Sequence, residues 1–324
     1  MSLGMGNESW AGFSEESTWG TEGTPRTKFL PLLRGGDGLG VSEDPIISDR
    51  MAVGVKASTD FNLGPISVNG DIEVEVYPEG IEMLLDHAMG AVATTQPDVT
   101  NDPTVYQHVF SLSDALQDGK GLSVEIDRGA AVFVYTGCKV DSMRLSARLN
   151  DYLKARFSLV GKDQVIEASP STPTFPAMNP YVFTEGVFKW GVTTVGISNA
   201  TIELRNNLDS DRRTTVSGRN ILEPVRGRKR EVTFECEVEF DSTALVVDFR
   251  AATSRALQLK YTGDVIAAGS YSQTFQIDMA VAKITEAMPQ ARDEGRIVYT
   301  VRGTAFIETA NEMTITVINT VTSV

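Results

Sequence analysis

The sequence predicts a mainly β protein in which one β-sandwich or barrel-like module occurs twice, each copy with one flanking α-helix. Apolar and polar residues alternate with a period of two along much of the 324-residue chain, which is typical of half-buried strands. Helical periodicity is confined to two short segments. A stretch of the first half also aligns with a stretch of the second half without a gap.

The clearest predicted strands carry glutamates along one face. In the first half, Glu73 and Glu75 alternate with isoleucine and valine over residues 72–76. In the second half, Glu235, Glu237 and Glu239 alternate with apolar residues over residues 232–240. Further strands are predicted at residues 139–145, 155–161, 201–207, 275–279, 297–301 and 313–318.

Two helices are predicted. In the first half, Ile81, Leu84, Leu85 and Ala88 follow the i, i+3, i+4, i+7 spacing of an amphipathic helix, and Gly90 marks its end. A second helix is predicted over residues 242–253, with Asp241 or Ser242 at its N-cap.

The strand and helix of the first half resemble those of the second half. Residues 46–90 align over residues 208–252, and this register places the tripeptide Ser-Asp-Arg at residues 48–50 on the same tripeptide at 210–212. It also places Glu73 and Glu75 on Glu235 and Glu237. Residues 154–161 resemble residues 296–303 at a different offset. The shared order of strand, helix and later strands favours a duplication over coincidence.

Composition divides the chain into four parts. Residues 1–45 are rich in Gly, Ser, Glu and Thr and are expected to form a flexible N-terminal arm. Residues 46–166 form the first predicted module and residues 183–324 the second. Between them, residues 167–182 contain four prolines, which fix φ and lack an amide donor, so an extended linker is expected.

Charge and residue usage exclude several functions. A net charge of −14 disfavours tight binding to nucleic acid, which depends on Lys and Arg. Cys138 and Cys236 fit neither a disulfide framework nor zinc spacing, and His87 and His108 belong to no catalytic motif. No membrane anchor, metal or cofactor is expected. Paired glutamates could suggest a glycosidase, but carboxylates on one strand face do not oppose each other across a substrate.

Two segments are predicted to contact other subunits. The compact apolar cluster of the arm is expected to dock on a neighbouring subunit; its members are Phe29, Leu30, Leu32 and Leu33. One basic stretch stands out in the acidic chain and is expected to meet carboxylates of another subunit. Its members are Arg212, Arg213, Arg226, Arg228, Lys229 and Arg230.

Three segments resemble the tail tube proteins of long-tailed, non-contractile (siphovirus-type) bacteriophages with two modules per chain. They are WGTEGTPRTKFLPL, VNGDIEVEVYPEGIEMLLDHAMG and the block from LSVEIDRG to ARFSLVGKD, and the resemblance covers most of residues 19–165. It implies a β-sandwich module with one helix, and homotrimeric rings stacked into a tube through which viral DNA passes without specific binding. Tape measure, tail terminator and baseplate or tail-tip proteins are the implied partners. The implied location is the virion tail, after assembly in the host cytoplasm.

Within this interpretation the five glutamates, Glu73, Glu75, Glu235, Glu237 and Glu239, are expected to line the channel. Two alternatives stay open at this point. A tube protein of a tailocin or injection machine would share the fold but carry no DNA. A β-sandwich capsid decoration or adhesion module would form no filament.

Overall fold

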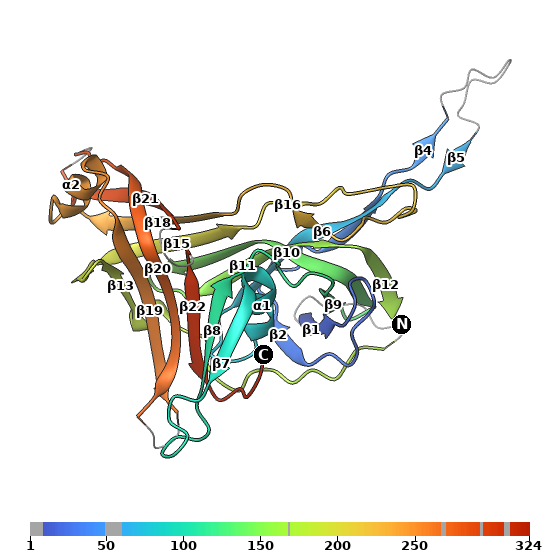
Figure 1. Cartoon of the computed structure of the whole chain (residues 1–324), viewed down its shortest axis with the longest axis horizontal. Helices are drawn as coiled ribbons and strands as arrows, with labels where there is room; N and C mark the ends of the chain where they lie inside the picture. The colour runs from blue at the N-terminus through green and yellow to red at the C-terminus, as the bar shows by residue number, and fades with distance from the viewer. Residues whose placement is uncertain (1–8, 49–59, 168, 267–269, 292–293, 308–311) are drawn as a thin grey trace.

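The protein is mainly β and contains two short α-helices among the residues described by the computed structural model (Figure 1). These residues are 9–48, 60–167, 169–266, 270–291, 294–307 and 312–324. Residues 1–8 of the predicted arm and residues 49–50 of the Ser-Asp-Arg match lie outside them. Helix α1 spans Glu82–Met89 and helix α2 spans Ala244–Arg250. All strand pairings that the structure describes are antiparallel.

The first half is organised around the 17-residue strand β10, Val132–Arg148. Its N-terminal part pairs with β9 and β12, and β9 pairs in turn with β1, which pairs with β2. Its C-terminal part pairs with β11, which leads to β6 and β3. The bounds are β1 Trp10–Glu16, β2 Lys28–Pro31, β3 Gly40–Glu43, β6 Ile66–Glu75, β9 Gly121–Asp127, β11 Lys154–Gly161 and β12 Asp163–Glu167.

The second half is organised around the 16-residue strand β20, Ser272–Ala287. Its N-terminal part pairs with β19 and β22, and β19 pairs with β13, which pairs with β14. Its C-terminal part pairs with β21, which leads to β18 and β15. The bounds are β13 Gly186–Trp190, β14 Thr193–Thr194, β15 Ile197–Arg205, β18 Glu231–Glu239, β19 Arg255–Val265, β21 Val298–Ala305 and β22 Thr314–Asn319.

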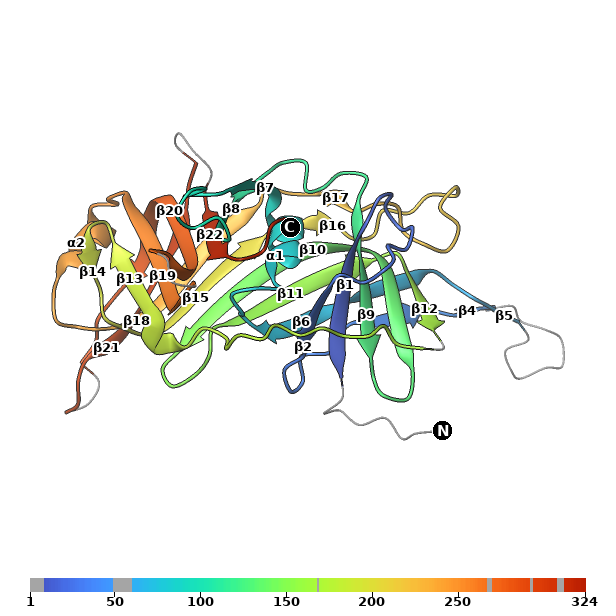
Figure 2. The same ribbon diagram turned by 90° about the horizontal axis from the view of Figure 1, so that it is seen from below.

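The sheet continues from one half into the other (Figure 2). Strand β15 pairs with the C-terminal part of β10, from Ser142 opposite Arg205 to Arg148 opposite Asn199. A second connection runs through β7, Gly90–Thr95, and β8, Tyr106–Leu112, because β8 pairs with β22. Strands of the two halves therefore share hydrogen bonds, and the halves are not joined by the chain alone.

Each half also has a long loop that contains a hairpin of two strands, each two residues long. In the first half, β4 (Ile46–Ile47) pairs with β5 (Phe61–Asn62), between β3 and β6. In the second half, β16 (Leu208–Asp209) pairs with β17 (Val225–Arg226), between β15 and β18. Both loops extend toward the same end of the molecule, and the first one projects beyond it (Figure 1).

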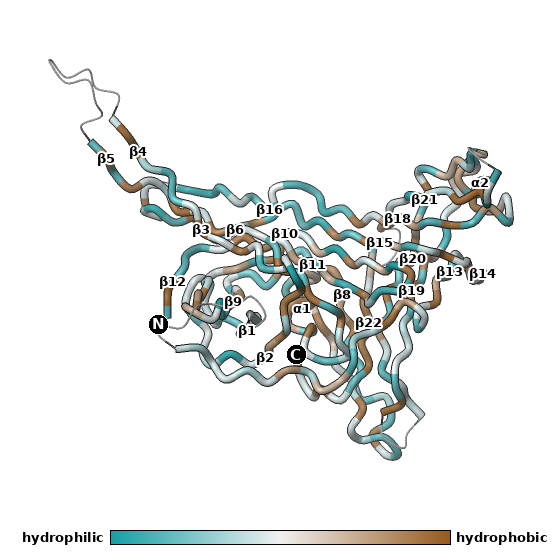
Figure 3. The backbone as a smooth tube through the Cα atoms, turned by 180° about the vertical axis from the view of Figure 1, so that it is seen from behind, coloured by the Kyte–Doolittle hydropathy of each residue, from teal (hydrophilic) through white to brown (hydrophobic). Residues whose placement is uncertain are grey.

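Hydrophobic and hydrophilic residues alternate along the predicted strands (Figure 3), because one face of each strand packs on the core. On β6, Ile72 and Val74 are fully buried, and on β18 the alternate residues Phe234 and Cys236 are buried. Each large apolar side chain buried in this way contributes about 1.5–3 kcal/mol. Both predicted helices are present, although α2 is shorter than residues 242–253. Gly90 ends α1 in the left-handed region at φ 93°, where glycine is strain-free.

The prediction of a flexible arm is wrong for the described part of residues 1–45. Strand β1 pairs with both β9 and β2, and Ala11, Phe13 and Leu30 are fully buried. Residues on both faces of β1 are covered, so its sequence lacks the period-two alternation by which a half-buried strand is recognised. Residues 169–181 of the predicted linker contain no helix or strand, but Ser171 bonds to Glu125 and Tyr181 is buried.

Candidate functional site: the polar sheet face and its open edges

All five predicted glutamates lie on one polar face of the sheet that runs through both halves. Glu73 and Glu75 are half-buried on β6, and Glu235, Glu237 and Glu239 are exposed on β18. The strands between them follow in the order β6, β11, β10, β15, β18. The two groups of glutamates therefore share a single surface, although about 160 residues of sequence separate them.

This polar face carries both signs of charge. Its acidic residues are Asp71, Glu73, Glu75, Glu203, Glu231, Glu235, Glu237, Glu239 and Glu286, and its basic residues are Arg144, Arg148, Lys154, Arg156, Arg205, Lys283 and Arg302. Arg156 pairs with Asp71 at 2.5 Å, and Arg302 pairs with Glu235 at 3.0 Å and Glu286 at 2.8 Å. Exposed pairs of this kind contribute at most about 1 kcal/mol each. The sequence did not suggest these basic residues.

The same cross-strand pair occurs in both halves. Glu73 on β6 lies directly opposite Arg156 on β11. Glu235 on β18 lies directly opposite Arg302 on β21. Since the sequence alignment places Glu73 on Glu235, Arg302 is the counterpart of Arg156. This register differs from the sequence alignment of residues 154–161 with 296–303, which placed Arg156 elsewhere.

The apolar cluster of the predicted arm lies within its own chain. Leu30 is fully buried, and Phe29 packs edge-on against Trp10 with ring centroids 5.3 Å apart. Leu32 packs partly buried against the core, and Leu33 is half-buried where its N–H donates to the Glu73 carbonyl. Phe29 and Leu30 are therefore not exposed for contact with a neighbouring subunit, contrary to the prediction.

Most of the basic stretch also binds within the chain. Arg213 donates to the Ile66 carbonyl at 2.8 Å and to Ser67 Oγ at 2.9 Å, at the start of β6 in the first half. Arg212 donates to the Glu223 carbonyl. Arg226 pairs with Asp114 at 2.9 Å and Arg230 pairs with Glu312 at 3.0 Å. The expected carboxylates are thus present, but on the same chain.

Arg228 and Lys229 differ from the rest of the stretch. Both are exposed, and neither side chain forms an ion pair with a described residue. They remain candidates for contact with another subunit.

A buried ion pair fastens the second-half loop to the first half. Lys139 Nζ lies 2.5 Å from Glu223 Oε1, and the Lys139 side chain is 5% exposed. Lys139 also donates to the carbonyls of Leu116 and Gln117. The Glu223 side chain is 28% exposed, so it is removal of Glu223 that leaves a buried charge, the Lys139 ammonium, without its partner, at a cost of about 3–5 kcal/mol. Neither residue was predicted, since the contact joins positions far apart in sequence.

Asn206 holds the same junction where β15 ends. Its N–H donates to the Asp141 carbonyl at 2.7 Å, and its side-chain amide donates to the carbonyls of Ala88 and Val140. The residue is fully buried. The edge of β10 is therefore covered by main-chain and side-chain bonds from the second half.

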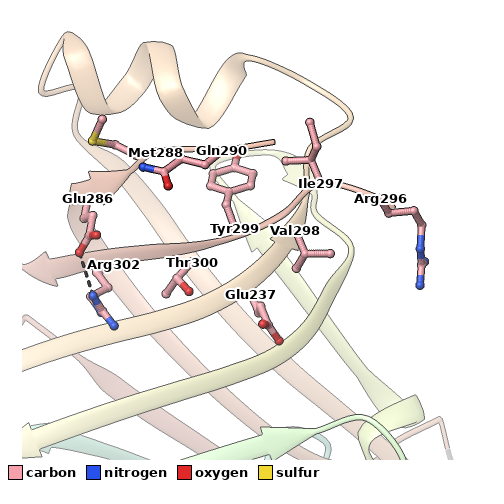
Figure 4. Close-up of a pocket in the computed structure, with 10 residues that line it drawn as sticks. All are labelled: Glu237, Glu286, Met288, Gln290, Arg296, Ile297, Val298, Tyr299, Thr300 and Arg302. Carbon is pink, nitrogen blue, oxygen red and sulfur yellow. Dashed lines mark hydrogen bonds and ion pairs between the residues drawn. The ribbon is translucent and has the colours of Figure 1, made fainter. Parts of the chain in front are cut away.

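The corresponding edge of β20 is open. From Ala282 to Ala287 this strand pairs with β21 on one side, while on the other side only Ala282 has a partner, Arg255 of β19, among the described residues. A hollow of about 450 Å³ lies beside this region (Figure 4). Glu237, Glu286 and Arg302 line it on the polar face, and Met288 and Tyr299 line it at the end of the strands.

Strand β3 also has an open edge. It pairs with β6 on one side, and no strand of the described residues pairs with its other side. Gly38 donates to the Asp71 carbonyl and Gly36 accepts from Glu73, so even-numbered residues face β6. The backbone groups of Leu39 and Val41 therefore face outward. The Leu39 carbonyl accepts from Tyr135 and Arg128, while Val41 is 38% exposed.

The histidines and cysteines have structural surroundings. Burial lowers the pKa of His87 to about 3, so this imidazole is neutral at physiological pH. His108 is buried and bonded to Thr94, Asn319 and the Val321 carbonyl. Burial raises the pKa of Cys138 and brings that of Cys236 to about 12, which keeps both thiols protonated. No helix in the described part of the chain is long and apolar enough to cross a membrane.

An open sheet edge presents unpaired N–H and C=O groups that can pair with a strand of another chain. The family model for phage tail tube proteins matches residues 6–317, and the chain belongs to this family. It is therefore a non-enzymatic structural component of the virion tail, and proteins of this kind self-assemble. Membership selects the tube protein over a capsid decoration or adhesion module. No curated protein matches the chain.

Proposed function

We propose that this protein is the major tail tube subunit of a long-tailed, non-contractile phage, with two copies of one module in each chain. Three chains form a ring of six modules, and stacked rings form the channel through which viral DNA is ejected. The observation that carries this proposal is the presence of two complementary open edges, one on β3 and one on β20.

The pairing pattern supports a duplication. In both halves a long strand pairs with different neighbours at its two ends, as β10 and β20 do. Strands β3 and β6 correspond to β15 and β18, and each pair is followed by a helix. The helices begin at Glu82 and Ala244, which the gapless sequence alignment places on each other.

This correspondence indicates how two chains join. Strand β15 covers the C-terminal part of β10 within one chain, and β3 is the counterpart of β15. Strand β3 of one chain would therefore cover the open part of β20 in the next chain. In this arrangement the Val41 N–H donates to a carbonyl of the stretch 282–286, as the Asn206 N–H donates to Asp141.

Such a contact is heterologous, because β3 and β20 are different surfaces. Repeated head to tail, it closes into a ring when the rotations between successive modules add up to one full turn without a rise. If the turn between chains equals the turn between the two modules of one chain, ring closure covers the open edges of both β3 and β20. Stacking of closed rings then extends the tube, and tape measure, terminator and tail-tip proteins would set its length and ends.

We assign the polar face to the channel, with Glu73, Glu75, Glu235, Glu237 and Glu239 lining it. The mixture of carboxylates and guanidinium groups on this face leaves no continuous run of positive charge. Tight DNA binding needs such a run to displace counterions from successive phosphates. A face of this kind allows DNA to slide without being held.

The edge contact is tested by Val41→Pro. Proline removes the outward N–H that the ring contact needs, while the bonds to β6 come from the even-numbered residues and remain. We expect a folded monomer that forms no rings or tubes in negative-stain micrographs, under conditions where the unaltered chain forms tubes. Tubes of normal width from this variant would overturn the edge contact.

The channel assignment is tested by changing Glu73, Glu75 and Glu237 together to lysine, with glutamine at the same positions as the control. We expect tubes to assemble in both variants, and phage carrying the lysine variant to eject DNA slowly or not at all. Normal infectivity of the lysine variant would contradict the assignment.

A further inference from the structure

The hairpin of β4 and β5 exposes an unusual amount of apolar surface. Ile46 is 58% exposed, Ile47 51%, Phe61 64% and Leu63 58%. Ile47 pairs with Phe61, so Ile47, Phe61 and Leu63 lie on one face of the hairpin, and Ile46, which pairs with Asn62, lies on the other. An exposed apolar cluster on a projecting hairpin indicates a surface that another molecule covers.

The corresponding loop of the second half shows where such a hairpin docks. That loop, residues 206–230, lies over the start of β6: the Ile66 N–H donates to the Arg219 carbonyl, and Arg219 donates to Gly64. Arg213 binds the Ile66 carbonyl and Ser67 in the same place. The loop of the second half therefore rests on the base of the hairpin of the first half.

The base of the second-half loop is uncovered. In the alignment of β6 with β18, residues 64–67 fall on residues 226–229. Ile66 is 8% exposed, while its counterpart Arg228 is exposed to solvent. Arg226 to Arg230 line a hollow of about 550 Å³ together with Asp114, Ile307 and Glu312. Ile307 is 61% exposed and the adjacent Phe306 is 44% exposed.

We infer that the β4–β5 hairpin of one chain docks in this hollow on the second half of another chain. This inference rests on the proposed head-to-tail ring and gives that ring a second contact. The exposed Asp44 at the base of the hairpin meets the unpaired Arg228 and Lys229, and the apolar side chains cover Phe306 and Ile307. Around the ring, the long loop of each half then rests on the base of the long loop of the neighbouring half.

The residues that meet in this contact are inferred from the ion pair between Lys139 and Glu223. In the same alignment Phe61 takes the place of Glu223. Lys139, the partner of Glu223, lies opposite Val160. The counterparts of Lys139 and Val160 are Val281 and Phe306, which are joined by a hydrogen bond from the Phe306 N–H to the Val281 carbonyl. An ion pair within the chain is therefore replaced by an apolar contact between chains, in which Phe61 packs on Val281 and Phe306.

This register is tested by building an ion pair like that of Lys139 and Glu223 into the proposed contact between chains, at residues 61 and 281. Phe61→Glu replaces the aromatic ring with a carboxylate against Val281 and Phe306, and we expect the critical concentration for assembly, measured by sedimentation, to rise about tenfold or more. Adding Val281→Lys recreates the pair and should bring the critical concentration back toward that of the unaltered chain. Val192→Glu, at a residue that is 99% exposed, serves as the matched control and should change nothing.

The outcomes separate this inference from the proposed function. An unchanged critical concentration in Phe61→Glu, with assembly abolished in Val41→Pro, would overturn the hairpin contact and leave the ring intact. Assembly that survives both changes would overturn the ring. Circular dichroism of each variant verifies that the monomer is folded.

A cysteine pair determines which chains are joined. The hairpin and β21 lie at opposite ends of one chain, so a disulfide between Phe61→Cys and Phe306→Cys has to link two chains (Figure 1). Both natural cysteines are buried and do not compete. Contact within a ring predicts a covalent ladder that ends at the number of chains in the ring. A ladder that continues beyond it would show contact between stacked rings and would contradict the inference.

Discussion

The long strands β10 and β20 carry out the same task in their halves, but only β10 has all of its neighbours. Strand β10 pairs with β9 and β12 at one end and with β11 and β15 at the other. Strand β20 pairs with β19, β22 and β21, and most of one side of its C-terminal part has no described partner. Under the proposed duplication, a single chain completes only one of two equivalent junctions.

The two helices also differ in how far their side chains are buried. Leu85 of α1 is fully buried, whereas Val247, at the same position of α2, is 57% exposed. Asp86 and Asp248 also occupy one position in the alignment, yet their pKa values move in opposite directions. Burial raises the pKa of Asp86 to about 6. The hydrogen bonds from Arg255, and then from Trp190, lower the pKa of Asp248 despite its burial.

The largest expected effect compares the covered edge of β10 with the open edge of β3. Asn206→Pro removes a main-chain bond and two side-chain bonds at the closed junction. We expect a loss of about 4 kcal/mol or more in the free energy of unfolding, measured with urea on the monomer. The matched change Val41→Pro at the open edge should cost less than about 1 kcal/mol. Equal losses would remove the distinction between the two edges.

A somewhat smaller effect is expected in the helices. Leu85→Ala leaves a cavity in the core and should lower the free energy of unfolding by about 2–5 kcal/mol. Val247→Ala should change it by no more than about 0.5 kcal/mol in the monomer, because that side chain is largely in solvent. Thermal or urea unfolding of both variants measures these changes in the free energy of unfolding. A large loss in Val247→Ala would mean that α2 is covered within the monomer.

The smallest effect concerns pH. The folded-state pKa of Asp86 is raised, so its charging destabilises the fold as pH increases between about 4 and 6. Asp86→Asn keeps the acceptor for Gln117 and should gain stability relative to the unaltered chain over that interval, by about 1–3 kcal/mol. A difference between the two proteins that does not depend on pH would contradict the raised pKa of Asp86.

The counterpart change Asp248→Asn should have the opposite sign. Its lowered pKa means that the carboxylate stabilises the fold above the ordinary Asp pKa, and that this stability is lost as pH falls through the folded-state value. The variant should therefore be less stable at neutral pH and approach the unaltered chain in acid. Unfolding at several pH values measures both aspartates in one experiment.

Much of the local structure could be predicted from the sequence. The alternation around Glu73 and Glu235 identified β6 and β18, and the spacing of Ile81, Leu84 and Leu85 identified α1. These signals are local, since one face of each element packs on the core and the other faces solvent or a polar layer. Strand β1 gave no such signal because both of its faces are covered, and its glycine- and serine-rich surroundings suggested an arm.

The junctions could not be predicted, because they depend on which strands lie side by side. Arg213 was part of a basic stretch without a visible target, and the structure shows its acceptors, Ile66 and Ser67, more than 140 residues away in the chain. Lys139 and Glu223 are ordinary charged residues in sequence, and only the fold makes them a buried pair. The open edges are likewise a property of pairing topology, which no single segment of the sequence contains.

A cryo-electron microscopy reconstruction of the assembled tube tests the central claim most directly. The account predicts β3 of one chain hydrogen-bonded to the C-terminal part of β20 of the next, three chains in each ring, and the polar face with Glu73 and Glu235 turned toward the channel. A tube in which the β20 edge stays open, or is covered by a segment other than β3, would contradict it.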